Sequence, residues 1–133
     1  MERTLVILKP DAVRRKLMGE LIMKFEKKNL EITQVKLEKI SRETAEIHYG
    51  HVKNLPFYDD MIDYMTASPS LIMIISGEKV IQVIRSMIGK TNSFEAQPGT
   101  IRGDYGLHFY ENLVHASDSI ENAEMEINRF FNN

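Results

Sequence analysis

The chain has 133 residues, 27% charged and 43% hydrophobic, and this composition predicts one globular domain over residues 1–133. Its formal net charge of -2 argues against a broad nucleic-acid-binding surface, which needs a basic excess, but permits a small anion pocket. Cysteine is absent, which excludes disulfides, thiolate metal sites and a cysteine nucleophile. The apolar run at residues 5–8 is too short for a signal peptide or a membrane span, so we expect a cytoplasmic protein without a membrane partner.

Hydrophobic periodicity and turn-forming residues divide the chain into alternating strands and helices. In chain order the predicted elements are a strand at 3–9, one helix at 11–29, a strand at 31–38, a helix after Ser41, a helix from Pro56 to about Met65, a strand at 71–75, a helix from Gly77 to Gly89, a loop at 90–109, a strand at 113–115 and a final helix from Asp118. Ser41 is a candidate N-cap, and Asp118 and Glu121 have the spacing of a capping box.

The helix after Ser41 and the helix from Pro56 are inserted between the second and third strands. Without these two helices, the order is β-α-β-β-α-β, the ferredoxin-like pattern. It predicts an α+β fold, a four-stranded antiparallel sheet with helices packed around it, in the simplest arrangement on one face. The loop at 90–109 has little periodicity and contains Pro98, Gly99, Gly103 and Gly106. Because a loop of this length in a compact domain is usually functional, we expect it to contribute to a site.

The segment 112–119 contains a candidate nucleophile. His115 ends a short apolar run and precedes Ser117 and Asp118, which are residues that start helices. A helix N-terminus favours anions, so an imidazole beside it can attack a phosphoryl group. By position alone, a structural histidine at the edge of the core is an equal alternative. Glu126 could fold back and hold the far ring nitrogen of His115, although a solvated helix charge is the ordinary interpretation.

Further polar and aromatic residues are candidate ligands, and each has an ordinary alternative on the surface or in the core. Lys9 ends the first predicted strand and suits a phosphate or hydroxyl contact, whereas Arg85 is on a helix whose other face is apolar. Thr91, Thr100 and Arg102 lie in the long loop, where the planar fork of an arginine can bind phosphate oxygens. Phe57 could stack on a base. We interpret the remaining histidines as surface or packing residues without obvious partners: His48, His51 and His108.

From end to end the chain resembles the nucleoside diphosphate kinase family. The matching segments, in the family's order, are 2–5 with 9–13, 48–49, 56–58, 91–92, 98–104 and 112–119. The resemblance implies ping-pong transfer of the γ-phosphoryl group from a nucleoside triphosphate such as ATP to a nucleoside diphosphate, through a phosphohistidine on His115. It also implies Mg2+ held mainly by the nucleotide phosphates, with no metal site on the protein, and a homo-oligomer, either a hexamer or a tetramer or dimer.

The resemblance assigns a role to each site residue. Glu126 would hold and polarise the ring of His115, with Ser117 alongside, and Tyr49 would support the pocket. The phosphates would contact Arg85, Thr91 and Arg102. The sugar 3′-hydroxyl region would contact Lys9 and Asn112, and the base would pack on Phe57.

Four residues depart from the family pattern. Ala116 stands where the family mostly has glycine, and we expect it to be tolerated unless the backbone needs a positive φ there. Ala12 and Lys16 replace frequent glycines, and we expect no effect. Ser93 replaces a usual proline, and with a short segment after Phe131 it predicts an oligomer that dissociates more easily. The competing interpretation is a catalytically silent binding module. The joint presence of six site residues argues against it: Lys9, Arg85, Arg102, Asn112, His115 and Glu126.

Overall fold

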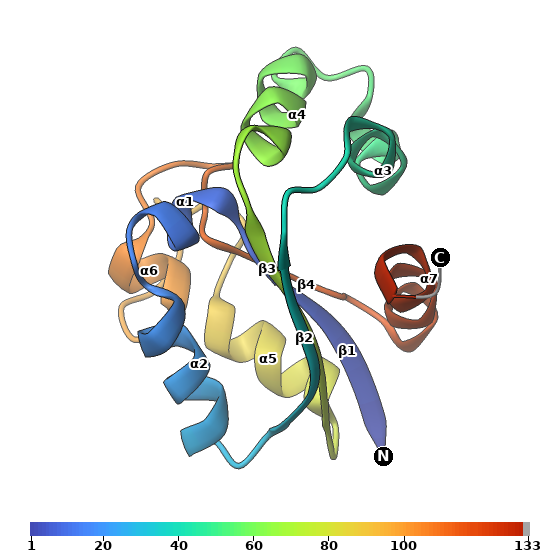
Figure 1. The fold of residues 1–133 in the computed structure, drawn as a ribbon. Coiled ribbons are helices and arrows are strands. Elements are labelled where there is room, and N and C mark those ends of the chain that lie inside the picture. Colours follow the sequence, from blue (N-terminus) through green and yellow to red (C-terminus); the bar gives the residue numbers. More distant parts are fainter. Residues whose placement is uncertain (132–133) are drawn as a thin grey trace.

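The computed structural model describes residues 1–131 and is built around a four-stranded antiparallel sheet (Figure 1). The strands are β1 (Glu2–Leu8), β2 (Glu31–Glu38), β3 (Ser70–Gly77) and β4 (Val114–Ala116), and they lie in the order β2-β3-β1-β4. The central strands β1 and β3 are buried on both faces, which explains their continuous apolar runs. The predicted α+β class and antiparallel sheet are therefore confirmed.

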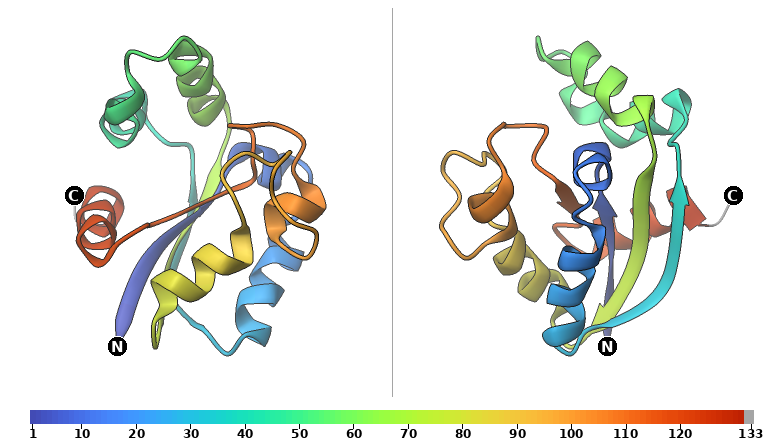
Figure 2. Two further views of the ribbon diagram at one scale, coloured as in Figure 1. Left: turned by 180° about the vertical axis from the view of Figure 1, so that it is seen from behind. Right: turned by 60° about the vertical axis from the view of Figure 1, so that its left-hand side comes forward.

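Helices cover both faces of the sheet, so placing them on one face was too simple. On one face Val6 and Leu8 of β1 pack with the first group of helices, and on the other face Leu5 and Ile7 pack with the second. Figure 2 shows the first group on one side of the sheet and α7 on the other. The first group is α1 (Pro10–Arg14), α2 (Met18–Lys27), α5 (Val80–Ile88) and α6 (Ile101–Tyr105), and the second is α3 (Arg42–His48), the 3-10 helix η1 (Gly50–Val52), α4 (Tyr58–Ala67) and α7 (Ile120–Phe131).

Both α3 and α6 begin with a side-chain cap, but only α3 was predicted. The Ser41 hydroxyl accepts a hydrogen bond from the backbone N–H of Thr44, as expected of an N-cap. In the region predicted as a loop, the Thr100 hydroxyl caps α6 in the same way by accepting from the N–H of Gly103. Because α6 has only five residues, it leaves almost no periodic signal in the sequence.

The final helix begins slightly later than predicted. The hydroxyl of Ser119 accepts a hydrogen bond from the backbone N–H of Asn122 at 3.0 Å, so Ser119 caps α7. Asp118 instead accepts from the side-chain amide of Asn122 at 2.6 Å. The predicted capping box, with Asp118 as the cap, is therefore wrong by one residue.

The single helix predicted at 11–29 is interrupted at Lys16. The backbone of Lys16 has a φ of 61°, in the left-handed region that glycine adopts without strain. α1 ends at Arg14 and α2 begins at Met18, so the chain turns between them. Lys16 thus carries a backbone strain that a glycine at this position would lack, so we predict an effect on stability where the sequence suggested none.

Replacing Lys16 with glycine is expected to raise the free energy of unfolding by about 0.5–1 kcal/mol. The gain is the removal of left-handed strain, partly offset by the greater entropy of glycine in the unfolded chain. Urea denaturation measures it. The matched control, Lys24→Gly inside α2, should lose about 1 kcal/mol. A Lys16→Gly protein no more stable than wild type would contradict this account.

Within residues 1–131, none of the helices combines the length and apolar character that crossing a membrane requires.

Candidate active site

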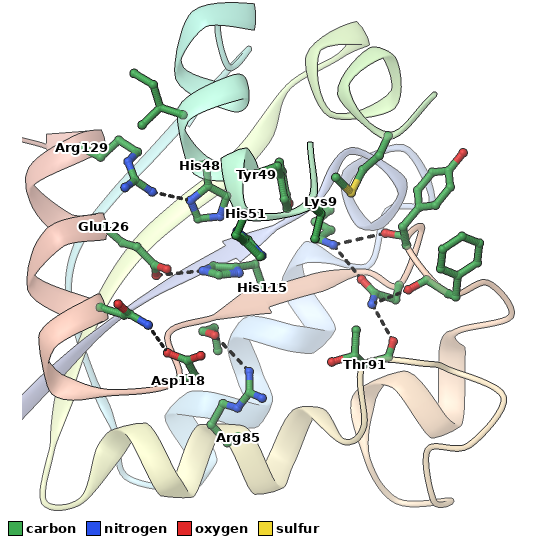
Figure 3. Close-up of a pocket in the computed structure, with 18 of the residues that line it drawn as sticks. Lys9, His48, Tyr49, His51, Arg85, Thr91, His115, Asp118, Glu126 and Arg129 are labelled. Carbon is green, nitrogen blue, oxygen red and sulfur yellow. Dashed lines mark hydrogen bonds and ion pairs between the residues drawn. The ribbon is translucent and has the colours of Figure 1, made fainter. Parts of the chain in front are cut away.

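A cavity of about 560 Å³ opens beside the C-terminal end of β1, with walls from α3, η1, α5, α7 and the segment before β4 (Figure 3). All but one of the residues to which the resemblance assigns a role line it, whereas the loop candidate Thr100 lies outside it and caps α6. Those that do are Lys9, Tyr49, Phe57, Arg85, Thr91, Arg102, Asn112, His115 and Glu126. The exception is Ser117, which is fully buried behind the cavity wall.

His115 lies in β4, where pairing with Ile7 of β1 holds its backbone. Before it, Leu113 has a φ of 76°, and the N–H of Val114 bonds the carbonyl of Asn112 at 2.9 Å, which is a γ-turn. Such a conformation is strained for leucine and persists because its side chain is fully buried. This turn directs the chain from the long loop into β4 and so sets where His115 stands.

Glu126 of α7 holds the ring of His115. Nε2 of His115 lies 2.9 Å from Oε1 of Glu126, and the hydroxyl of Ser117 donates to the same oxygen at 2.7 Å. Burial works to raise the pKa of Glu126, but the hydrogen bonds and charge of its neighbours lower it overall, so it is a carboxylate. A carboxylate accepting from Nε2 leaves the lone pair of a neutral imidazole on Nδ1. His115 thus has the tautomer of a nitrogen nucleophile.

Lys9 is nearly fully buried at the end of β1. Its ammonium donates to Oδ1 of Asn112 at 2.8 Å and to the carbonyl of Tyr110 at 3.2 Å. The amide of Asn112 donates in turn to the carbonyl of Thr91 at 2.7 Å. Burial, assisted by the charge of Arg102, lowers the pKa of Lys9 to about 7. A ligand with negative charge would therefore restore its cationic form.

The two arginines predicted to bind phosphate differ in their surroundings. Arg102 is 4% exposed and donates to three backbone carbonyls, those of Gly89 at 3.0 Å, Asn112 at 3.4 Å and Val114 at 2.6 Å. Arg85 is exposed and, within residues 1–131, donates a single hydrogen bond, to the carbonyl of Ala116 at 3.3 Å. Arg102 therefore also holds the walls of the cavity together, whereas Arg85 is available to a ligand.

Aromatic side chains form one end of the cavity. Phe57 packs edge-on against Phe109, with ring centroids 4.9 Å apart, and stacks at 6.0 Å with Tyr110. Deeper in the cavity, the Tyr49 hydroxyl is buried without a hydrogen-bond partner among the described residues, and burial raises the pKa of Tyr49. The cavity thus has an apolar end, where a flat ring can pack, and a polar end with unsatisfied groups.

Sequence reasoning missed His48, which was expected to have no partner. It is buried, its ring centroid lies 4.5 Å from that of His115, and its Nδ1 is 3.0 Å from a guanidinium nitrogen of Arg129. Arg129 comes three residues after Glu126, a spacing that puts both on one face of a helix and could have been noticed. His51 also lines the cavity, whereas His108 does not and accepts backbone N–H groups of its own loop.

The ligand atoms of His48, His115 and Glu126 all lie within 4.8 Å of one another. Two imidazoles and a carboxylate are donors that suit a transition metal. Here, however, the guanidinium of Arg129 bonds His48 and Glu126 accepts two hydrogen bonds. The adjacent cation disfavours a second one, and we interpret the group as a hydrogen-bonded unit.

Two residues that depart from the family pattern, Ala116 and Ser93, are both buried. Ala116 lies in β4 with a buried side chain and is not among the residues with positive φ, so the condition under which alanine would be strained does not arise. Ser93 is buried against Gly106, and its hydroxyl has no hydrogen-bond partner among the described residues.

Comparison with known proteins agrees with this geometry. The family profile described as nucleoside diphosphate kinase matches residues 2–133. A nucleoside diphosphate kinase from Acetivibrio thermocellus is 60% identical over 131 residues, covering 98% of this chain and 96% of the relative. One from Methanocaldococcus jannaschii is 52% identical over 130 residues, covering 98% and 93%.

Solved structures give the same result. The apo nucleoside diphosphate kinase from Encephalitozoon cuniculi superposes with a TM-score of 0.97 at 40% identity, covering 100% of this chain and 90% of that one. A halophilic nucleoside diphosphate kinase from Halobacterium salinarum, in complex with CDP, has a TM-score of 0.96 at 37% identity, covering 99% and 88%. With a cavity that joins a carboxylate-held histidine to buried cations, and with this similarity over the whole length, the chain belongs to the nucleoside diphosphate kinase family.

Proposed function

We propose that the chain transfers the γ-phosphoryl group of a nucleoside triphosphate, such as ATP, to a nucleoside diphosphate by a ping-pong reaction through His115. The observation that carries the proposal is the hydrogen bond from His115 to Glu126, which leaves Nδ1 as the free nucleophile beside a cavity that contains cations. The family relationship and the CDP complex of the Halobacterium salinarum relative support nucleotides as the ligands.

The first half-reaction forms one bond and breaks one. Nδ1 of His115 attacks the γ-phosphorus, an N–P bond forms, and the bond from that phosphorus to the bridging oxygen breaks, so the nucleoside diphosphate leaves with that oxygen. In the second half, a terminal β-phosphate oxygen of another nucleoside diphosphate attacks the phosphorus and the N–P bond breaks. The Nε2 proton stays on His115 throughout, and the Glu126 carboxylate that accepts it in a hydrogen bond stabilises the positive charge that develops on the ring.

The other site residues position and neutralise the triphosphate. In this proposal Arg85, Thr91 and Arg102 bind phosphate oxygens, because phosphoryl transfer depends on fixed donors and cations more than on covalent groups. Lys9 and Asn112, already hydrogen-bonded to each other, contact the sugar hydroxyl and the transferred group, and Tyr49 supports them. The base packs on Phe57 and makes no hydrogen bonds that would distinguish one base from another, so the site can accept nucleotides with different bases. Ser117 acts by holding Glu126.

Magnesium enters as part of the nucleotide substrate. Mg2+ is usually held by one or two carboxylates together with substrate phosphates. Among the described residues that line the cavity, the carboxylates are those of Glu126 and Asp118, and Glu126 already accepts from His115 and Ser117. This donor set fits an ion held mainly by the β- and γ-phosphates, with Asp118 available to it, which would neutralise phosphate charge. We place the reaction in the cytoplasm, where ATP is available.

Mass spectrometry tests the proposal. Intact protein incubated with ATP and Mg2+ should gain one phosphoryl group that is stable in base, is lost in acid, and passes to added GDP as GTP. An unchanged mass, with nucleotide still bound, would replace the kinase by a silent nucleotide-binding module.

The activity is expected to fall as the pH rises above about 7 because of Lys9. The pKa of this lysine is lowered to about 7 by burial, so the free enzyme holds the cation below that pH and the neutral amine above it. Only the cation attracts phosphate, so kcat/KM should decline on the alkaline side, by at most about tenfold per pH unit. A Lys9→Gln variant, less active throughout, should lack this decline. If both proteins show the same alkaline slope, another group is responsible.

We also propose that the chain forms a homo-oligomer in which β2 meets β2 of a second copy. β2 lies at one edge of the sheet, and Val35 and Leu37 on it are 55% and 54% exposed. An apolar edge strand exposes unpaired backbone groups that favour pairing with another chain. A pair formed this way is a dimer, from which a tetramer or hexamer can be built.

Light scattering should report an assembly larger than the 15.4 kDa chain, and Val35→Lys should reduce it. The control Ile120→Lys, at an equally exposed position on α7, should leave the mass unchanged. Repeating the measurement across a urea series tests the easier dissociation expected from Ser93. A monomeric wild type would contradict the proposed oligomer. An assembly that persists up to the unfolding transition would contradict the easier dissociation.

A further inference from the structure

Three side chains form a row that leads away from the proposed nucleophile. Arg129 of α7 bonds Nδ1 of His48 at 3.0 Å, and the His48 ring lies edge-on to the ring of His115, with centroids 4.5 Å apart and planes at 79°. Figure 3 shows the row beside Glu126, with Arg129 on the far side of His48 from His115. The proposed reaction assigns no role to Arg129 or His48.

The contact with Arg129 fixes the state of His48. An arginine can only donate, so Nδ1 of His48 must accept, and the neutral ring then has its proton on Nε2. The ring is also packed edge-on against Tyr49 at 4.8 Å and Phe130 at 5.4 Å. Burial lowers the pKa of His48 well below its ordinary value, assisted by the facing charges of His115, Arg129, Lys9 and His51. The ring is therefore held neutral, in one tautomer and one orientation.

The shape of α7 connects this row to Glu126. Glu126 and Arg129 are one helical turn apart, and both side chains face the cavity. The same helix thus contacts His115 in two ways, through the hydrogen bond of Glu126 and through the Arg129–His48 pair that packs against the ring. We call this pair the brace. Without the brace, the His115 ring could turn away from the orientation in which Nε2 meets Glu126 and Nδ1 is free.

We propose that Arg129 is a positioning residue that acts through His48 to hold the His115 ring in its reactive orientation. The inference rests on the proposed phosphorylation of His115 and adds to it a residue outside the matching segments. The competing explanation is that Arg129, which also lines the cavity, contacts the nucleotide phosphates directly.

A double-mutant cycle distinguishes the two explanations. Arg129→Leu and His48→Phe, which keeps a ring but removes the acceptor, should each slow single-turnover phosphorylation by ATP at saturation about tenfold, with little change in nucleotide affinity. The double variant should be no slower than either single one, because both remove the same brace. Additive losses, or a loss confined to nucleotide affinity, would overturn the proposal in favour of direct contact.

Two further proteins make the result specific. Arg129→Lys keeps a cationic donor and should recover most of the rate. Arg42→Leu removes an exposed arginine at the start of α3, where it pairs with Asp63 of α4, and should match wild type. A lysine variant as slow as Arg129→Leu, or a wild-type rate in Arg129→Leu, would overturn the proposal. Urea unfolding of each variant checks that the fold is retained.

Imidazole nitrogen-15 spectra test the pair even where no phosphohistidine forms. In wild type, His48 should show an unprotonated Nδ1 and a protonated Nε2, and His115 a protonated Nε2. In Arg129→Leu, both rings should show mixed tautomers. Unchanged spectra would overturn the positioning role. Ordered spectra in a wild type that ATP does not phosphorylate would instead refute the proposed function and leave the positioning pair standing.

Discussion

Replacing His115 with alanine is expected to abolish phosphoryl transfer. The Nδ1 nitrogen of this residue is the proposed acceptor, because the hydrogen bond from Nε2 to Glu126 leaves its lone pair free beside the cavity. Loss of a covalent nucleophile lowers kcat by about a million-fold in well-studied cases, and a loss of this order is expected here. Intact mass after incubation with MgATP and a coupled assay of GTP formation from GDP both measure it.

Binding should survive this change. The phosphate and base contacts proposed for Arg85, Thr91 and Phe57 do not involve the imidazole, so nucleotide affinity should change little. His108→Ala is the matched control, because His108 lies outside the cavity and should leave the phosphoryl label in place. A His115→Ala protein that still acquires an acid-labile phosphoryl group would show that another residue is the nucleophile.

Replacing Arg102 with methionine is expected to lower the free energy of unfolding by about 3 kcal/mol, the largest effect on stability among these predictions. Methionine fills a similar volume but donates no hydrogen bond. Three backbone carbonyls would lose the guanidinium as a donor, those of Gly89, Asn112 and Val114, although the carbonyl of Asn112 would keep its bond from the N–H of Val114. Urea denaturation followed by circular dichroism measures the change, and activity should fall with it.

Arg85→Met provides the comparison, since the same substitution is made at an exposed arginine with one hydrogen bond of 3.3 Å. It should change the unfolding free energy by less than about 0.5 kcal/mol while raising KM for the nucleotide. Equal stability losses in the two variants would refute the structural role assigned to Arg102. The resemblance assigned both arginines to the phosphates, and the structure separates them by burial and by the number of backbone carbonyls that each one bonds.

Local patterns were enough to predict much of the fold. The continuous apolar run at 71–75 marks β3, Gly89 ends α5, and Ser41 caps α3, because each depends on neighbours in the chain. The same reasoning failed at Lys16 and in α6. At Lys16 the left-handed backbone has no sequence marker when glycine is absent, and α6 is too short to show a period.

The site follows the same division. The residue types and their order along the chain determined the family, the histidine expected to react and most of the cavity lining, because these are properties of short segments. Only the tertiary structure decided that Arg102 spans three carbonyls, that Ser117 lies behind Glu126, and that Arg129 reaches His48. These contacts join residues whose meeting depends on how the sheet pairs and how α7 packs across it. Hydrogen bonding and burial are set by distance in space, which the spacing of residues along a chain does not specify.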